Sequence, residues 1–264
     1  MDWGRAKTVL IWAFLFLNIL LGYQLWMDEL NLNTFTENAA RRDEMNRLLD
    51  LKDIRLEAAV PEGTPMLSEI TVSVQEAGLP ESPEPLRALL TQDALDDVQR
   101  VRDALSTVVP NVGEYEADPF AAKDGGIVYV MNQLYEELPM FEMRLELYGA
   151  EDGTVAGYRY LSAQRETPVN ARPPQGQEVL SAYVVIGTLA ETYLPQGAVI
   201  ADVRLGYHGP MFKSETQVLA PYWRVVLQTG ETYYVHAING AVEGPSGTQA
   251  ADGGGGDGES LPSE

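Results

Sequence analysis

The sequence predicts an α+β protein: a single N-terminal transmembrane helix followed by two modules, each an antiparallel sheet with a helix. Three observations predict this fold. Residues 8–27 form an apolar run without a formal charge, several later segments alternate apolar and polar side chains, and two later segments have helical spacing. Each half of the outer chain follows the order strand pair, helix, proline-containing break and further strands. A true duplication and a coincidental likeness are both open at this point.

The run at residues 8–27 has the length of a membrane span. A helix of about 20 residues rises roughly 30 Å, the thickness of a bilayer's hydrocarbon core. A cleaved signal peptide would have a shorter apolar region that ends at small residues, whereas this run ends within GYQLWMDEL. An interfacial helix would need a charged face. We therefore expect an uncleaved spanning helix.

Charges beside the run predict its orientation. Arg5 and Lys7 precede it, and Asp28 and Glu29 follow it. Because positive charge stays on the cytoplasmic side, residues 1–7 are expected in the cytoplasm. The rest of this single-pass protein of the cell membrane is expected to be extracellular.

The outer part of the chain is strongly acidic. The whole chain has 39 acidic and 18 basic residues, and one and two of these, respectively, precede residue 28, which leaves a net charge of −22 outside. Such a surface repels nucleic acid and anionic lipid headgroups. There is no cysteine, so the fold needs neither disulfides nor a reducing compartment.

The first extracellular module is expected at residues 28–138. Helical spacing and capping residues predict a helix over 33–50 and a long acidic helix from about Glu84 to Val108. Period-two alternation predicts strands at 54–58 and 70–74, and the segments at 111–120 and 125–135 are also strand-like.

The second extracellular module is expected at residues 139–244. Two alternating strands, FEMRLELY and TVAGYRYLSAQ, flank a glycine-containing turn, and a largely apolar helix follows from about Glu178 to Tyr193. Three strands complete the module, in AVIADVRLGYH, VLAPYWRVVLQ and TYYVHAI. Residues 245–264 are rich in glycine and acid and are expected to be a disordered tail.

No catalytic or metal-binding motif is present in the sequence. The chain has two histidines, His208 and His236, which lack the spacing of metal ligands and are expected to be structural. There is no GxSxG, Gly-Lys-Thr or strand-linked GxGxxG motif. The adjacent acids Asp96-Asp97 and Glu136-Glu137 point in different directions and are expected on solvated faces. We predict no enzyme, cofactor or metal, and a membrane-anchored wall hydrolase is the weaker alternative.

One polar residue lies in the middle of the predicted span. The amide of Asn18 is costly in lipid unless a second helix satisfies it, although a single tolerated amide is an open alternative. Residues at helical spacing would share its face, and a glycine among them would let a second helix approach. The predicted partner-binding face consists of Phe14, Leu15, Asn18, Leu21, Gly22 and Leu25.

Several stretches resemble the YycI (WalI) family. The N-terminal end has MDW, a lysine after a short gap, and a span that ends near GYQLW. The C-terminal half has LSAYVVIGTL, ADVRLGY, VLAPYWRVVL and YYVHAINGAVEG in the family's order. The resemblance covers the span and about residues 140–244, and the first outer half is less distinctive.

The resemblance implies a regulatory role and a YycI/YycH-like α+β fold. Members of this family are single-span membrane proteins of Gram-positive bacteria. Together with YycH they bind the sensor histidine kinase YycG (WalK) through transmembrane helices. The two-component system YycFG (WalRK) controls cell-wall metabolism. The C-terminal strands also resemble PepSY-type domains. A second interpretation is therefore a stand-alone extracellular binding module for a peptide or cell-wall ligand.

Overall fold

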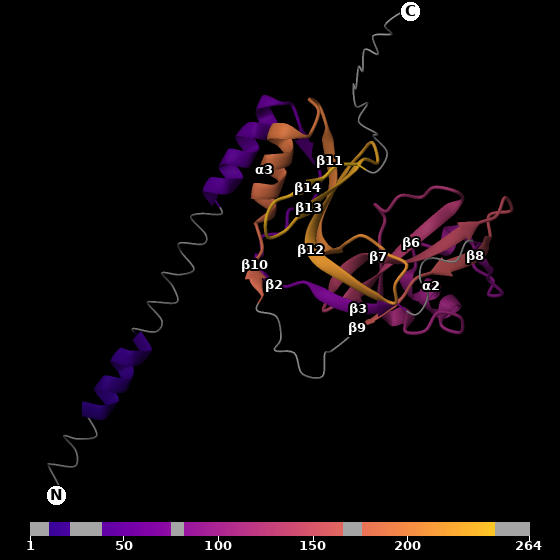
Figure 1. The fold of residues 1–264 in the computed structure, drawn as a ribbon, viewed down its shortest axis with the longest axis horizontal. Helices are drawn as coiled ribbons and strands as arrows, with labels where there is room; N and C mark the ends of the chain where they lie inside the picture. Colours follow the sequence, from indigo (N-terminus) through magenta and orange to yellow (C-terminus); the bar gives the residue numbers. More distant parts are fainter. Residues whose placement is uncertain (1–10, 22–38, 75–81, 166–175, 246–264) are drawn as a thin grey trace, which may run out of the picture.

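The protein has a mixed α+β fold built around one large sheet (Figure 1). The structure, a computed structural model, describes residues 11–21, 39–74, 82–165 and 176–245. Residues 11–21 and 39–51 are helical, and the strands and two further α-helices follow. The predicted α+β class is thus confirmed. Within the four described ranges, no helix is long and apolar enough to cross a membrane. The helix at 11–21 falls inside the predicted span at 8–27, and the rest of that run lies outside the described residues.

Twelve strands form the main sheet, and most neighbours in it are antiparallel. Its longest path runs β14-β13-β12-β11-β7-β6-β5, and β1 and β7 both pair with β11 in parallel. The strands are β1 (Arg55–Leu56), β3 (Ile70–Val74), β4 (Glu84–Pro85), β5 (Tyr115–Ala117), β6 (Ile127–Tyr135), β7 (Leu138–Gly149), β8 (Val155–Tyr160), β9 (Ala163–Arg165), β11 (Val199–His208), β12 (Thr216–Leu227), β13 (Thr232–His236) and β14 (Val242–Glu243). A separate pair joins β2 (Met66–Leu67) to β10 (Gln177–Glu178).

Helix α2 (Val98–Leu105) covers one face of the first half of the sheet, which consists of β4 to β8. Val101 and Leu105 of α2 are buried against a cluster that includes Leu145 and Leu147 of β7. Burial of each such side chain contributes about 1.5–3 kcal/mol. Because side chains alternate along a strand, Arg144, Glu146 and Tyr148 lie on the opposite face of β7.

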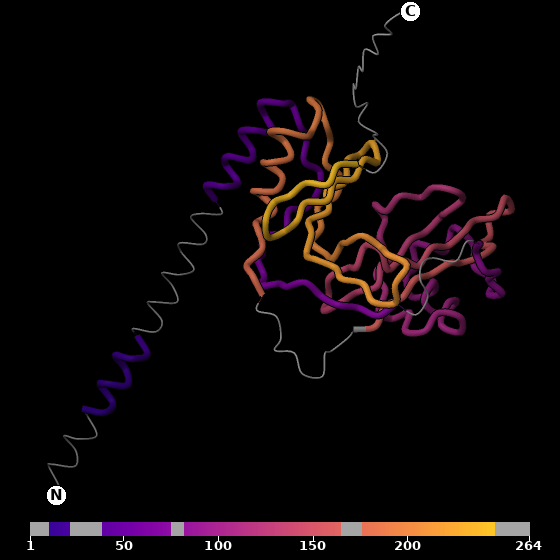
Figure 2. Tube along the Cα trace, in the orientation of Figure 1, coloured from indigo at the N-terminus to yellow at the C-terminus, as the bar shows by residue number. Residues whose placement is uncertain are grey.

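Helix α3 (Ala182–Thr192) and the helix at 39–51 cover the second half of the sheet, which consists of β1 and β11 to β14. The two helices lie side by side (Figure 2). Met45 and Leu49 are buried in the same cluster as Ile186 and Leu189 of α3, and Trp223 of β12 belongs to it too. The first segment of the fold is therefore packed into the core formed by the last segments.

Strands β7 and β12 join the two halves. The first part of β12 pairs with β3, and the remainder pairs with β11 and β13. Strand β7 pairs with β6 and β8, and it reaches β11 where Met140 lies opposite Tyr207. A Cβ on Gly206 would lie 2.5 Å from the Pro139 carbonyl oxygen, so only glycine permits this approach. The predicted boundary between 138 and 139 falls at the hairpin of β6 and β7 and stays a prediction.

Most of the predicted strands are confirmed. The segments at 111–120 and 125–135 contain β5 and β6, and FEMRLELY and TVAGYRYLSAQ contain most of β7 and β8. The last three predicted strands correspond to β11, β12 and β13. The segment at 70–74 is β3, with alternate residues buried, whereas 54–58 contributes only the two residues of β1.

The predicted long helix from Glu84 to Val108 is wrong in its extent. Glu84 and Pro85 form strand β4, which pairs with Tyr158 and Gly157 of β8. Proline has no N–H for a helix ladder, and the Leu86 N–H donates to the Ala156 carbonyl instead. A 3-10 turn follows at Gln92–Ala94. The helix begins only after Asp97, whose carboxylate accepts hydrogen bonds from the N–H groups of Gln99 and Arg100.

The other two predicted helices are confirmed with changed or incomplete bounds. The segment predicted at 33–50 is helical over 39–51, and residues 33–38 lie outside the described part. Helix α3 begins at Ala182 and not near Glu178, because Gln177 and Glu178 pair with β2. The tail predicted at 245–264 lies outside the described residues apart from Pro245.

Candidate functional site

The predicted partner-binding face lies partly on the helix at 11–21. Phe14, Leu15 and Leu21 are exposed by 65%, 47% and 51%, and Asn18 is exposed on the same helix. Helical spacing places these four residues on one side of the helix. Gly22 and Leu25 lie outside the described residues, so the complete face stays a prediction.

A cleft of about 760 Å³ lies where the two halves of the sheet meet. One wall is the loop at 118–124 after β5, and the other is the turn at 229–232 between β12 and β13. Phe141 and Arg144 of β7 contribute to the lining. Small-molecule sites commonly occupy such junctions.

Arg224 of β12 and Asp118 form the buried floor of this cleft. The Arg224 Nη2 atom donates to Asp118 Oδ1 at 2.9 Å, and Nη1 donates to Asp118 Oδ2. A second donation from Nη2 reaches Asp202 Oδ2 of β11 at 2.9 Å. The Asn132 amide donates to Asp118 Oδ2 at 2.6 Å. One guanidinium therefore connects the first half of the sheet to the second.

Electrostatics keep this pair ionised. Burial alone would raise the pKa of Asp118, but hydrogen bonds from Arg224, its positive charge and the Asn132 amide lower that pKa below its usual value. Burial would lower the pKa of Arg224, and the two carboxylates raise it instead. The guanidinium also lies over the Phe141 ring, 4.7 Å from its centroid. These contacts fix the orientation of the Arg224 guanidinium and therefore the shape of the cleft floor.

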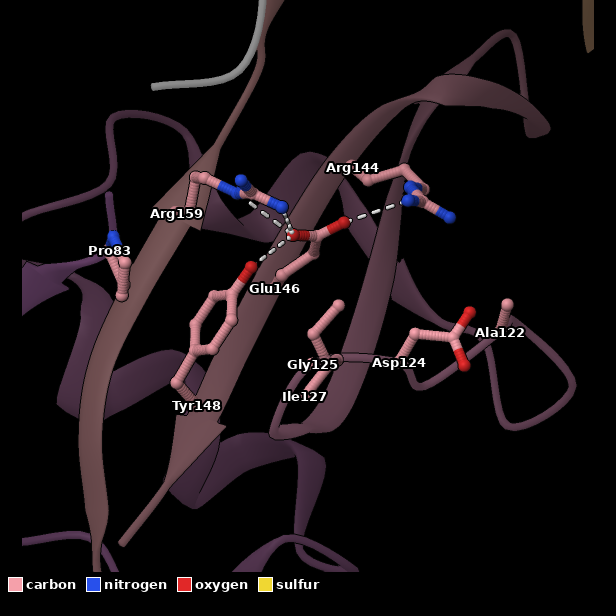
Figure 3. A pocket seen from close by; sticks show the side chains of 9 residues that line it. All are labelled: Pro83, Ala122, Asp124, Gly125, Ile127, Arg144, Glu146, Tyr148 and Arg159. Carbon is pink, nitrogen blue, oxygen red and sulfur yellow. Dashed lines mark hydrogen bonds and ion pairs between the residues drawn. The ribbon is translucent and has the colours of Figure 1, made fainter. Parts of the chain in front are cut away.

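A second pocket, of about 470 Å³, adjoins the first, since Ala122, Asp124 and Arg144 line both. Figure 3 shows Arg144 and Arg159 on opposite sides of the Glu146 carboxylate. The Glu146 side chain is fully buried, and it accepts hydrogen bonds from Arg144 Nη2 at 2.8 Å and Arg159 Nη2 at 2.6 Å. The Tyr148 hydroxyl donates to the same carboxylate at 2.8 Å. One buried acid thus orients two cationic side chains.

His208, at the end of β11, lies between two carboxylates. Its Nδ1 is hydrogen-bonded to Glu142, and its Nε2 lies 3.2 Å from Glu243 Oε2 of β14. The ring stacks on Tyr234 with centroids 3.9 Å apart. Burial would lower the pKa of His208, but hydrogen bonds and negative charge from Glu142, and then Glu243, raise it above its usual value. When protonated, the ring of His208 donates to Glu142 of β7 and to Glu243 of β14, and so connects both strands to β11.

The other residues that the sequence singled out, the second histidine and the adjacent acids, lie in turns or at the end of a strand or helix. The His236 Nδ1 accepts from the N–H groups of Ile238 and Asn239 in the turn before β14. Glu136 and Glu137, with φ of 47° and 69°, form the two-residue turn between β6 and β7. Asp97 caps α2. Across the described residues, no group of three or more His, Cys, Asp or Glu is placed to hold a metal ion.

Sequence reasoning missed the two pockets and the polar clusters around them. The partners Asp118 and Arg224 are 106 positions apart, and no local pattern links them. Glu142, Arg144 and Glu146 occupy alternate positions of β7, which marks one face of a strand. A charged residue at every second position was therefore the one available signal, and it looks the same as a solvated face.

Comparison with known proteins identifies a family. A model of the YycI family, described as YycI protein, matches residues 53–238. No curated protein matches the chain. Among solved structures, one similar chain is an uncharacterized protein from Eubacterium rectale ATCC 33656, with 15% identity and a TM-score of 0.31. The similarity covers 44% of this chain and 42% of that one. The family match includes β1 to β13 and therefore extends across both halves of the sheet.

Proposed function

Because this chain belongs to the YycI family, we propose that it is an accessory regulator of the YycFG (WalRK) two-component system. In this proposal it is anchored in the cell membrane by residues 8–27, with residues 1–7 in the cytoplasm and the sheet outside. It binds the sensor histidine kinase YycG (WalK), acts with YycH and tunes cell-wall metabolism. The observation that carries the proposal is the family match over residues 53–238.

The proposed contact with the kinase is the helix face around Asn18. The apolar side chains on this helix are exposed in the isolated chain, as Phe14 and Leu15 illustrate. In a membrane such a face can pack against another helix, and a buried amide then adds a hydrogen bond between the helices. A regulator of this type shifts the kinase between two packings only by the difference in its affinity for them.

The test is co-purification of the full chain with the kinase in a mild detergent, together with the phosphorylation rate of the kinase. Asn18→Leu should weaken co-purification roughly three- to thirtyfold, since one hydrogen bond between helices contributes about 0.6–2 kcal/mol. Leu20→Ala, on the opposite side of the same helix, is the matched control. A variant with Phe14, Asn18 and Gly22 replaced by leucine has leucine at every position of the face. If it leaves kinase binding and output unchanged, the proposed contact is wrong.

A second candidate function is a stand-alone extracellular binding module of PepSY-like type. The cleft of about 760 Å³ between the two halves of the sheet favours it. Exchange of residues 8–27 for an unrelated spanning helix separates the two candidates. A binding module would keep its activity after the exchange, whereas a regulator that acts through helix contacts would lose it.

A further inference from the structure

Arg144 occupies the junction of the two pockets. It lines both the cleft at the meeting of the two sheet halves and the adjoining pocket around Glu146. Its side chain is 31% exposed although the Glu146 carboxylate that holds it is fully buried. This guanidinium is therefore accessible from either pocket.

The Arg144 guanidinium has hydrogen-bond capacity to spare. Among the described residues its one hydrogen bond runs from Nη2 to Glu146 Oε1, so Nε and Nη1 are available. Arg159 differs, since both its Nε and its Nη2 donate to Glu146 Oε2, at 3.0 and 2.6 Å. The Glu146 carboxylate thus faces two positive charges, and Arg144, at 31%, is more exposed than Arg159, at 21%. The Arg144 Nη2 has a second hydrogen, which forms a two-donor edge of the plane with either Nε–H or Nη1–H, and such an edge matches an oxyanion.

An exposed aromatic side chain lines the same cleft as Arg144. Phe120 lines the cleft and is 39% exposed. The loop that carries it is anchored, because the Phe120 N–H donates to Asp118 Oδ1 at 3.3 Å, next to the buried Arg224. An exposed ring on an anchored loop provides an apolar contact surface in the cleft that Arg144 also lines.

We propose that Arg144 and Phe120 form a binding site for a small ligand that carries an oxyanion and an aromatic or apolar group. The oxyanion contacts Arg144, and the apolar group lies against Phe120 in the larger cleft. Carboxylate and phosphate share the required geometry. Asp124 lines both pockets and repels such a ligand. This site is independent of the helix contacts proposed for kinase regulation.

The test uses ligand-observed NMR on the full chain in a mild detergent, with protein-free micelles as the blank. The probes are N-acetylphenylalanine, phenyl phosphate and, as the uncharged match, N-acetylphenylalaninamide. We expect one or both anionic probes to bind and the amide to bind at least tenfold more weakly. Binding of the carboxylate alone, or of the phosphate alone, identifies the oxyanion class. Equal binding of all three probes, or of none at 10 mM, overturns the proposal.

Variants locate the site. Arg144→Gln should weaken anion binding about tenfold or more, because it removes charge-assisted hydrogen bonds. Arg47→Gln, on the helix at 39–51, is the control.

Asp124→Asn should strengthen anion binding because it removes a repelling negative charge, an effect that local unfolding cannot produce. Phe120→Ala should weaken binding of phenyl phosphate while that of inorganic phosphate is unchanged. Unaltered affinity in both Asp124→Asn and Phe120→Ala would place any binding elsewhere and contradict the assignment, even if Arg144→Gln failed to fold.

Discussion

Arg224 of β12 and Asp118, which follows β5, form a buried ion pair that joins the two halves of the sheet. Their side chains are 4% and 0% exposed, so neither group can exchange its partner for water. Asp202 accepts from the same guanidinium, and Asn132 donates to Asp118. The position of the cleft wall at 118–124 relative to β12 therefore depends on one arginine.

Asp118→Asn should destabilise the fold by about 3 kcal/mol or more. The substitution leaves the buried Arg224 with the Asp202 carboxylate alone, and loss of one partner from a buried pair typically costs about 3–5 kcal/mol. The measurement is the urea midpoint of the full chain in detergent. Asp96→Asn, at an exposed position before α2, should change stability by less than about 0.5 kcal/mol. Similar midpoints for both variants would contradict the stated role of Asp118.

Gly206→Ala should cost about 1–3 kcal/mol. The added Cβ would lie 2.5 Å from the Pro139 carbonyl oxygen and 2.7 Å from Phe141 Cζ, so β11 and β7 must separate. The matched control is Gly113→Ala, since a Cβ there meets nothing within 4 Å. Thermal unfolding of both variants checks the difference, and equal melting temperatures would show that β7 and β11 do not approach so closely in solution.

Stability should fall as the pH rises past neutrality because of His208. Its pKa is raised in the folded protein, so its contribution is complete below the unfolded value of about 6.5 and is lost as the pH rises through the folded value. The groups that face it are Glu142, Glu243, Tyr222 and Tyr234. The measurement is the free energy of unfolding between pH 6 and 9.

Two variants isolate this pH dependence. His208→Gln should be less stable at pH 6 and should lack the decline above neutrality. His236→Gln removes the acceptor for two backbone N–H groups, so it should lower stability while the decline above neutrality persists. A decline that survives in His208→Gln would assign it to another group. The lowered pKa of Asp118 acts in the acid range, where its contribution is lost as the pH falls.

Trp223→Phe should destabilise the fold by about 2–4 kcal/mol. The indole is fully buried, and its Nε1–H donates to the Leu180 carbonyl at 2.8 Å. Phenylalanine leaves that carbonyl without this donor and leaves unfilled volume between β12 and α3. Tyr193→Phe, at a position 45% exposed, is the control. Guanidinium denaturation of both variants gives the comparison.

The strands were predictable because their signal is local. In β3, for example, residues 70, 72 and 74 are buried and the residues between them are half-buried, the alternation visible in ITVSV. The prediction of a long helix from Glu84 was wrong because Pro85 pairs with Gly157 of β8, more than 70 positions away. Helical spacing over 86–105 was present, but a distant strand outcompeted it.

The pockets were not predictable for a related reason. In the sequence, Glu146 is one of several charges in an alternating strand. Only the fold brings Arg159 of the next strand into contact with it. His208 was expected to be structural, and its two carboxylate partners come from positions 66 and 35 residues away. In both cases the chemistry arises from residues that the sheet brings together.

The place of the helix at 39–51 has a consequence for the order of folding. The cluster under α2 uses residues 90 to 158, a continuous stretch that is complete before α3 is synthesised. Met45 and Leu49, by contrast, pack with partners between Val179 and Ala237, and the Lys52 ammonium donates to the Glu191 carbonyl 139 positions later. Such distant contacts form slowly. A chain that emerges from the ribosome must therefore keep this helix without its core partners until the last strands appear, although every residue of the middle cluster has by then been synthesised.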